Sequence, residues 1–456
     1  MNIANIETSY LSIPEFYAGR TVFITGGTGF LGKVLIEKLL YSCDNIDTIY
    51  ILLREKNGIG AKERRNRLLN SPVFSRLREK KAESLSKIKH VVGDITVFNL
   101  GLTSDQEELL KKVSVVFHLA ATIRFDEPLK NALNINLEGT REVLRAFKNQ
   151  SKLDAFVYVS TAFSNTDKKE IDECIYPPPR TLAEVYAFSI KEEVSDEDLC
   201  EFLNGRPNTY TFTKALAENM LAEEHGDVPA VIVRPSIVTA AAEEPFKGWI
   251  DNWMGITTFF FTIAKGWTRV LYGKRNFVLD IIPVDYVVNL TIIAAARCKR
   301  SIDVPVLNIC SSSANPISSG LLVNLLIKES AKQKFYDIPL FGVLYIKSAV
   351  LVTIVSFIVE TIAAYLIDLW LRITCRSKSF VSFVEVQKKQ SRVREKMRYF
   401  QLGSWKIKST RTSDLYASLT IPDRKTFPCD AGDLRWSEYV PTYFNGLVRY
   451  LVDSRK

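Results

Sequence analysis

The sequence contains few histidines and no closely spaced cysteines. Only three histidines occur in 456 residues, and none is placed near an acid-base partner, so catalysis by histidine is not expected. The seven cysteines are odd in number and widely spaced, and they form no C-x-x-C pair. This pattern argues against a disulfide framework and structural zinc, predicts no metal site, and is typical of a reducing compartment.

The start of the chain also lacks a basic residue cluster followed by an apolar run, so we expect no signal peptide. Apolar residues make up 47% of the chain and charged residues 24%, as in a folded globular protein with two or more domains. The net charge is +9, but the basic residues are dispersed and no nucleic-acid recognition motif accompanies them. Anionic lipid or a polyphosphate cofactor therefore explains the charge better than a nucleic acid does.

Short β-type runs alternate with helical patterns along the first two thirds of the chain. The β-type runs lie at 21–25, 48–54, 88–95, 113–121, 153–163 and 229–238, and the helical patterns include 33–42, 133–150 and 212–226. This alternation predicts an α/β fold with a doubly wound parallel sheet, followed by a smaller, mainly helical C-terminal domain. We expect an N-terminal extension at 1–14, a nucleotide-binding domain with substrate-binding insertions at 15–330, and the C-terminal domain at 331–456. The polar segment 167–206 is expected to form a long loop or a small helical cap over the site.

A glycine turn, TGGTGFLG, follows the first predicted strand and opens the first predicted helix. Gly26, Gly29 and Gly32 lack a Cβ, so the backbone can turn tightly there and approach a pyrophosphate at the positive end of the helix. An ordinary turn is the alternative, but the strand before and the helix after favour a dinucleotide site. The neighbouring residues expected to contact the dinucleotide are Thr28, Phe30 and Leu31.

The end of the second predicted strand carries Arg54 where proteins that prefer NAD place an acid. A guanidinium suits a 2′-phosphate, so Arg54 favours NADPH, although Glu55 follows directly. Arg64 and Arg65 lie nearby in the sequence and are either further phosphate contacts or residues of a surface helix. Asp94 is placed to bond the adenine amino group, or else acts as a turn aspartate.

Tyr210 and Lys214 lie four residues apart in YTFTK, which is about one helical turn. A cation near a phenol lowers its pKa from about 10, and a tuned phenol can protonate a carbonyl oxygen while a hydride reaches the carbon. Ser160 and Thr161 follow a strand, and either hydroxyl could bind that oxygen. The other residues expected to line the cofactor site are Ile95, Ala120 and Pro235. His118 is expected to be a packed strand residue.

The segment 338–371 is almost entirely apolar and is interrupted by Lys347, Glu360 and Asp368. Its longest uncharged run, 348–359, is 12 residues, shorter than the roughly 20 of a simple membrane span. A re-entrant hairpin or an interfacial helix fits better, and a buried core helix is the alternative. Basic residues follow, namely Arg372, Arg376, Lys378 and several in 388–398, and they suit either the cytosolic face of a membrane or a solvated helix.

Eight motifs occur in the order found in fatty acyl-CoA reductases, members of the extended short-chain dehydrogenase/reductase superfamily. They are TGGTGFLG, FHLAATIRFDE, NLEGT, YVSTAF, YTFTK, VRPSIV, EPFKGWIDN and DIIPVDYVVN. The segment FPCDAGDLRWSEYVPTYFNGL resembles the small, male-sterility-type C-terminal domain of that family. The resemblance covers roughly residues 15 to 450.

The resemblance implies a reaction in which a long-chain fatty acyl-CoA is reduced by NADPH to an aldehyde and then to a primary alcohol. Tyr210 would donate the proton, Lys214 would lower its pKa and bind the nicotinamide ribose, and Ser160 or Thr161 would position the oxygen. It also implies a membrane lipid surface as a partner and a catalytic domain that faces the cytosol at the endoplasmic reticulum or peroxisome. A homo-oligomer is compatible with it. An enzyme acting on a sterol or sugar nucleotide, or a catalytically silent cofactor-binding protein, are the alternatives.

The sequence departs from the family's pattern in two places. Glu360 and Ala363 stand where the family typically carries a histidine and a proline, and the sequence ends at GLVRYLVDSRK, where the family often has a further membrane helix. We expect these differences to affect how the protein meets a membrane and not its chemistry.

Overall fold

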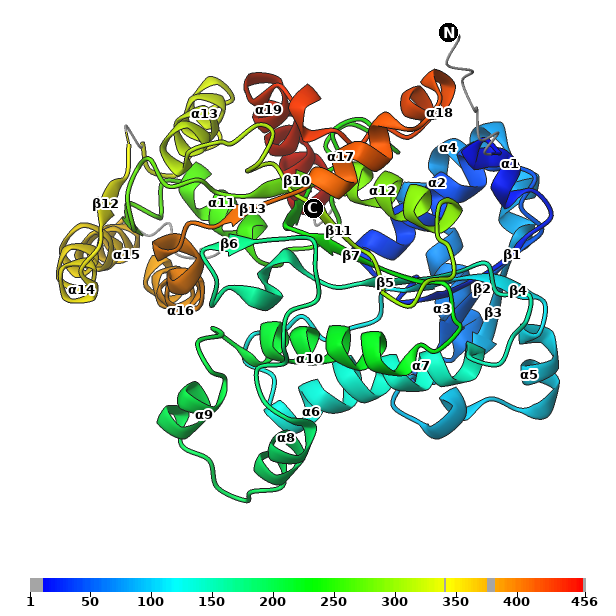
Figure 1. The fold of residues 1–456 in the computed structure, drawn as a ribbon. Coiled ribbons are helices and arrows are strands. Elements are labelled where there is room, and N and C mark those ends of the chain that lie inside the picture. Colours follow the sequence, from blue (N-terminus) through cyan, green and yellow to red (C-terminus); the bar gives the residue numbers. More distant parts are fainter. Residues whose placement is uncertain (1–10, 340–341, 375–381, 454–456) are drawn as a thin grey trace, which may run out of the picture.

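Seven parallel strands form one sheet through the middle of the protein (Figure 1). The computed structural model describes residues 11–339, 342–374 and 382–453. The strand order is β11-β7-β5-β4-β1-β2-β3, so the order reverses between β1 and β4. Their bounds are β1 (Thr21–Thr25), β2 (Thr48–Leu53), β3 (Ile88–Val92), β4 (Val113–His118), β5 (Ala155–Val159), β7 (Ala230–Pro235) and β11 (Val306–Ile309). The predicted doubly wound sheet is confirmed.

Helices cover both faces of this sheet (Figure 1). The helices α2 (Phe30–Ser42) and α12 (Val284–Ala296) pack on one face, and α7 (Gly139–Phe147) and α10 (Thr209–Glu224) pack on the other. Alternate side chains of each strand point to opposite faces, so Val22 and Ile24 join one hydrophobic cluster and Phe23 joins the other. Shorter helices connect these elements: α1 (Ile13–Tyr17), α3 (Ala61–Leu69), α4 (Ser75–Lys80), α5 (Ser104–Leu110) and α6 (Leu129–Leu133).

The segment 167–206 was predicted to be a long loop or a small helical cap, and it contains two short helices. They are α8 (Leu182–Ser189) and α9 (Asp196–Phe202), which lie below α10 in Figure 1. Phe188 and Phe202 stack with ring centres 3.8 Å apart, and Phe202 in turn contacts Phe212 of α10. The same segment holds β6 (Glu170–Ile171), which pairs with β13 (Lys406–Ile407) and so joins the insert to the C-terminal part of the chain.

The C-terminal part is mainly helical, as expected, but it shares a hydrophobic core with the sheet domain. The last long helix, α19 (Trp436–Leu447), packs against α13 (Ser319–Lys332), and both belong to the cluster that also holds α2 and α12. The boundary near 330 stays a prediction, because the core continues across it. The remaining elements are α11 (Ile256–Ala264), α14 (Ala349–Ser356), α15 (Ala363–Ile373), α16 (Phe383–Leu402), α17 (Thr410–Ala417) and α18 (Ile421–Thr426), with the short pairs β8 (Ile237–Thr239) with β10 (Ile281–Pro283) and β9 (Val270–Tyr272) with β12 (Leu344–Ile346).

The apolar segment forms one continuous helix over 349–373. The π-helical stretch Phe357–Ile362 joins α14 to α15, so the re-entrant hairpin is wrong for these residues. The helix is 25 residues long and apolar enough to cross a membrane by length and composition. Only 22% of its most apolar window is buried, so the core-helix interpretation is also wrong. Arg376 and Lys378 lie outside the described residues.

A buried ion pair fixes α10 to the sheet. The guanidinium of Arg234 on β7 donates to both carboxylate oxygens of Glu218 on α10, at 2.8 and 2.6 Å, and both side chains are at most 1% exposed. Arg234 also donates to the carbonyl oxygens of Asp172 and Cys174. One side chain thus joins a central strand, the long helix beside it and the insert.

We predict that Arg234→Met destabilises the fold by about 3–5 kcal/mol, because Glu218 would be left buried without its counter-charge. Thermal unfolding of the purified protein measures this as a lower Tm. The double variant Arg234→Met/Glu218→Leu should recover part of the loss, since no charge then stays buried. Arg67→Ala is the matched control: it breaks an exposed pair with Glu63 and should cost about 1 kcal/mol or less. Equal losses in Arg234→Met and Arg67→Ala would contradict this role.

Candidate active site

The predicted site residues converge at the carboxyl ends of the central strands. The glycine turn follows β1, Ala120 follows β4, Ser160 and Thr161 follow β5, and Pro235 ends β7. Parallel strands end at the same edge of the sheet, and the order of the sheet reverses between β1 and β4. Open α/β sheets bind ligands at such a switch point.

A side chain would be tolerated differently at each of the three glycines. Gly26 has a φ of +73°, and a Cβ there would lie 2.8 Å from the backbone nitrogen of Ala120. A Cβ on Gly32 would lie 2.4 Å from the carbonyl oxygen of Gly26, so α2 could not approach β1 as closely. A Cβ on Gly29 would meet only that same oxygen, at 3.2 Å. The fold therefore requires Gly26 and Gly32, whereas Gly29 leaves open space in front of the helix.

The first turn of α2 is suited to hold a phosphate. Gly29 is the N-cap residue and offers no side-chain hydrogen bond to the first N–H groups of the helix. Uncapped N–H groups at a helix N-terminus form a positive end that binds anions. Phe30 and Leu31 lie in this turn and Thr28 directly precedes its N-cap, so the residues present fit the pyrophosphate of a dinucleotide.

Two arginines meet beside the glycine turn. Arg64 on α3 donates to Thr28 Oγ1 at 3.2 Å and to the carbonyl oxygen of Arg54 at 2.7 Å. Burial lowers the pKa of Arg64, and the nearby charge of Arg54 lowers it further. Arg65 instead donates to the carbonyl oxygen of Ile88 on β3. The structure thus separates two neighbours that the sequence left equivalent.

Asp94 takes part in a turn and also in an ion pair. Its carboxylate accepts hydrogen bonds from the backbone and hydroxyl of Thr96 and from Arg54 Nη1, the last at 2.9 Å. Burial acts to raise the pKa of Asp94, but these hydrogen bonds outweigh it and hold the pKa below the usual value. Ile95 is buried in the hydrophobic core against Gly139 of α7.

Tyr210 lies in the first turn of α10 and contacts Thr161. Burial raises the pKa of the Tyr210 phenol to about 12, against a hydrogen bond with the side chain of Thr161 that lowers it. The hydroxyl of Ser160 is buried and has no hydrogen-bond partner within the described residues. Of the two hydroxyls that the sequence left open, the structure brings Thr161 to the phenol.

Lys214 lies one turn further along α10, but its ammonium points to the sheet. Nζ donates to the carbonyl oxygen of Val159 at 2.7 Å and lies 4.5 Å from the centre of the Tyr158 ring. Burial lowers the pKa of Lys214 to about 7, opposed by the charge of Glu218. The expected lowering of the Tyr210 pKa is therefore absent: burial and the charge of Glu218 both raise it. The four-residue spacing places Tyr210 and Lys214 on the same face of α10. The direction of the long lysine side chain is set instead by its hydrogen bond to Val159.

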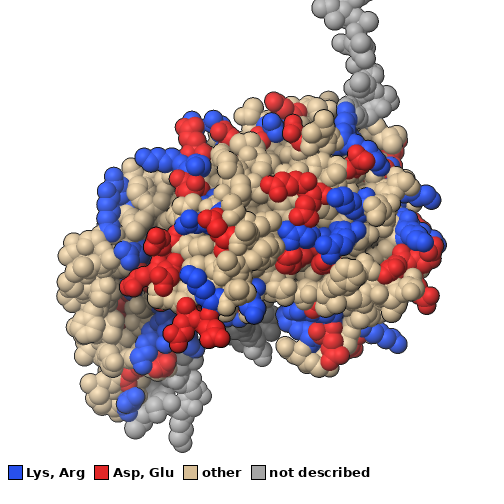
Figure 2. Space-filling model, turned by 60° about the horizontal axis from the view of Figure 1, so that its bottom comes forward, with Lys and Arg blue, Asp and Glu red and all other residues tan. Residues whose placement is uncertain are grey.

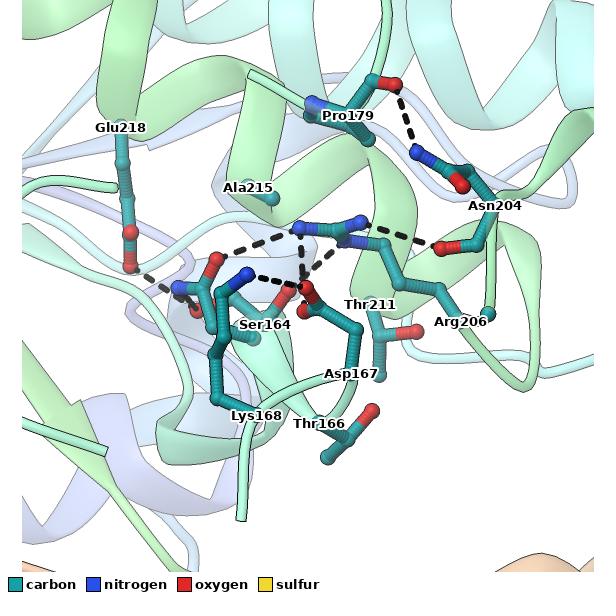
Figure 3. A network of polar contacts seen from close by, with 12 residues as sticks. Ser164, Thr166, Asp167, Lys168, Pro179, Asn204, Arg206, Thr211, Ala215 and Glu218 are labelled. Atoms are coloured by element: carbon teal, nitrogen blue, oxygen red, sulfur yellow. Dashed lines mark hydrogen bonds and ion pairs between the residues drawn. The ribbon is translucent and has the colours of Figure 1, made fainter. Parts of the chain in front are cut away.

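Arg206 holds the loop after β5 against the start of α10 (Figure 3). Its guanidinium is buried and donates to the carbonyl oxygen of Ser164 at 2.9 Å, and it lies 3.4 Å from Asp167. The hydroxyl of Ser164 contacts both the carbonyl oxygen of Thr161 and the carboxylate of Glu218. This network connects the loop that carries Thr161 to the helix that carries Tyr210, and sequence reasoning did not find it.

An aromatic cluster covers the other side of Tyr210. The Phe125 ring lies nearly parallel to the Tyr210 ring with centres 6.3 Å apart, and Phe400 of α16 lies 5.5 Å from Phe125. Phe163, which follows Thr161 in the chain, contacts Phe400 at 5.4 Å. Phe125 and Phe163 stand within two of the noted motifs, whereas no local signal connects Phe400 to a tyrosine 190 positions earlier.

His118 is buried on β4, as expected. Its ring nitrogens contact the hydroxyls of Thr25 and Thr140 at 2.7 and 3.0 Å. Burial lowers the pKa of His118 to about 3, and the charge of Lys214 adds to this. His118 is therefore a neutral imidazole with a hydrogen-bond contact at each ring nitrogen, and its role in the strand is structural.

Two family models match the chain. Both are described as male sterility protein; an NAD-binding model matches residues 24–291 and a second matches residues 359–454. Among curated proteins, fatty acyl-CoA reductase 1 of Xenopus laevis is 35% identical over 453 residues, covering 97% of this chain and 87% of its own. Fatty acyl-CoA reductase 1 of Homo sapiens is 34% identical with the same coverage.

Solved structures share the fold at low sequence identity. The terminal R domain of the myxalamid PKS-NRPS pathway superposes with a TM-score of 0.62 at 20% identity, covering 95% of this chain and 91% of that one. The reductase domain of a nonribosomal peptide synthetase from Mycobacterium tuberculosis gives 0.60 at 18% identity, with 95% and 92% covered. A UDP-glucuronic acid 4-epimerase of Bacillus cereus in complex with NAD gives 0.53 at 15%, with 94% and 99% covered. These likenesses concern the fold.

The glycine geometry predicts two different outcomes for the same substitution. Gly32→Ala should lower the Tm, because the new methyl group meets backbone atoms of the turn at 2.4 and 2.7 Å. Gly29→Ala should fold normally but bind a nicotinamide dinucleotide about tenfold more weakly or worse, because its methyl group occupies the phosphate approach. Isothermal titration and thermal unfolding separate the two effects. Wild-type affinity in Gly29→Ala would refute the phosphate assignment.

Proposed function

Because the chain belongs to the fatty acyl-CoA reductase family, we propose that it reduces a long-chain fatty acyl-CoA to a primary alcohol through an aldehyde, using NADPH. The observation that carries this proposal is the contact of Tyr210 with Thr161 at the sheet edge that also carries the glycine turn, with Phe125 stacked on the Tyr210 ring. The protein is an oxidoreductase with a nicotinamide-binding domain.

We assign separate groups of residues to the different parts of the bound cofactor. Gly26, Gly29 and Gly32 would hold the pyrophosphate, and Arg54 with Arg64 would hold a 2′-phosphate. The residues assigned to the adenine and nicotinamide ends are Asp94, Ile95, Ala120, Pro235 and Lys214. When bound, the cofactor supplies hydride. Arg64 supports NADPH over NADH, because its guanidinium reaches Thr28 in the glycine turn and lies near enough to the Arg54 charge for its pKa to be lowered, and neighbouring cations suit a dianionic group.

Tyr210 would donate the proton to the substrate oxygen, and Thr161 would position that oxygen. A phenol with a raised pKa keeps its proton at neutral pH, so it is in the donor form before reaction. Lys214, with a pKa near 7, is poised to take up charge when its surroundings become more anionic. Thr161 is preferred to Ser160 because it already contacts the phenol.

Phe125, Phe163 and Phe400 would receive the acyl chain beside the thioester carbon. Aromatic rings give an apolar surface for methylene groups, and Phe125 connects this surface to the ring of Tyr210. We propose the C-terminal domain 331–456 as the region that completes this wall. The exposed apolar helix 349–373 supports attachment to a membrane. We propose that the catalytic domain then faces the cytosol.

The direct test is product analysis with purified, detergent-solubilised protein, NADPH and a series of acyl-CoA chain lengths. We expect a primary alcohol and about two NADPH consumed per thioester, since acid-level carbon needs four electrons to become an alcohol. Tyr210→Phe should lose most activity, about 10²–10⁴-fold, as for loss of a general acid. If no chain length gave aldehyde or alcohol while a sterol or sugar nucleotide was turned over, the alternative enzyme class would replace this proposal. NADPH binding without any reduction would indicate a silent cofactor-binding protein.

Cofactor choice can be tested at two adjacent arginines. Arg64→Ala should raise the KM for NADPH about 10–100-fold and leave the weaker use of NADH nearly unchanged, because one charged hydrogen bond to the 2′-phosphate is lost. Arg65→Ala is the matched control, since Arg65 binds the backbone of Ile88 and should not change the preference. Equal effects on NADPH and NADH in Arg64→Ala would count against the assignment.

A further inference from the structure

The outward face of the helix 349–373 is apolar along its whole length. Three charged residues occur in this helix: Glu360 is buried, Asp368 is half-buried, and Arg372 is exposed in the last turn. The large side chains that are at least 40% exposed are Val350, Leu351, Ile354, Phe357, Ile358, Ile362, Tyr365, Leu366, Leu369, Trp370 and Ile373. In Figure 2 a broad uncharged surface follows the left edge of the protein, where Figure 1 places α14 and α15. A continuous apolar surface of this size marks a binding face.

The inward face of the same helix is bound to the protein at its start, middle and end. Val352 packs against Val270 and Tyr272 of β9. At the other end, Asp368 accepts hydrogen bonds from Ser382 and from the backbone of Phe383, where α16 begins. A helix that crosses a bilayer leaves the soluble domain behind, but this helix stays against it from end to end.

Glu360 makes the middle attachment. One carboxylate oxygen accepts from the backbone N–H groups of Arg269 and Val270 at 2.6 and 2.9 Å. The other accepts from Gln387 and Arg394 of α16 at 2.7 and 2.8 Å. The Glu360 side chain is fully buried, so its charge is satisfied by protein and does not face the apolar side.

The neighbour of this helix cannot enter hydrocarbon with it. Along α16, Lys388, Lys389, Arg392 and Lys396 are exposed. If 349–373 crossed a bilayer in this arrangement, α16 would bring these charges into the membrane core, at a cost of a few kcal/mol each by insertion scales. A helix that lies in the interface buries its apolar face only about 5–10 Å deep and leaves such charges in water.

We propose that the helix 349–373 lies flat in one leaflet of a membrane, held to the protein by Glu360, and does not cross it. The occupant of the exposed face is therefore the acyl region of a lipid leaflet. Tyr365 and Trp370 suit the headgroup boundary, where aromatic rings gather.

The same attachment connects the membrane face to the site. Arg394, which binds Glu360, and Phe400, which contacts Phe125 beside Tyr210, lie on the same helix, six residues or about 9 Å apart. This part of the inference rests on the proposed function: an acyl chain that leaves the leaflet would meet the aromatic wall first.

Vesicle binding tests the face. The full-length protein, freed of detergent, is mixed with phosphatidylcholine vesicles containing some phosphatidylserine and separated by flotation. Wild type should float, and Ile358→Glu and Leu366→Glu should each lower the bound fraction at least about tenfold. Ile302→Glu is the matched control, because Ile302 is an exposed apolar residue on another part of the surface. Variants that float like wild type would overturn the proposal.

Labelling from one side distinguishes a flat helix from a spanning one. Lys347→Cys and Thr374→Cys, at exposed positions just outside the two ends of the helix, are bound separately to preformed sealed vesicles and treated with a membrane-impermeant thiol reagent, and mass spectrometry locates the label. A flat helix exposes both ends to the outside, so both positions should react. Label at only one position would show that the helix crosses. Acyl-CoA reduction in detergent is assayed in parallel: activity without flat binding refutes only this inference, and flat binding without activity refutes only the proposed reaction.

Discussion

The buried pair of Arg234 and Glu218 is the interaction on which the geometry of the site depends. It fixes the rotation of α10 on the sheet, and that rotation sets where Tyr210 and Lys214 point. The same carboxylate accepts from Ser164, which also holds the carbonyl of Thr161, so helix and loop share one anchor. Its charge has a chemical effect as well, because it raises the pKa values of both Tyr210 and Lys214.

The C-terminal region reaches the site through α16. Along α16, Gln387 and Arg394 bind Glu360 below the apolar face, and Phe400 completes the aromatic wall over Tyr210. The two matched regions therefore meet beside Tyr210 and also along the hydrophobic core that α19 shares with α2 and α12.

The parts of the fold that follow from local pattern were predictable. β1 occupies 21–25 as expected, because a β-branched run that ends in a glycine turn depends only on neighbours in the chain. The apolar segment was harder: counting uncharged residues favoured a hairpin or an interfacial helix, and the continuous helix 349–373 rules out only the hairpin for these residues. Glu360 interrupts the apolar run without interrupting the helix, since Arg394 and Gln387 neutralise it from a distant part of the sequence.

The sequence by itself determined the parallel sheet, the glycine turn and the four-residue spacing of Tyr210 and Lys214, because each is a periodic or local property of the chain. The tertiary structure alone decided which of Ser160 and Thr161 meets the phenol and which of Arg64 and Arg65 faces the turn. Adjacent residues in an extended or helical backbone point in different directions, and only packing fixes which direction faces the site. It also decided the sign of the Tyr210 pKa shift, because burial and the charge of Glu218 are set by the whole fold.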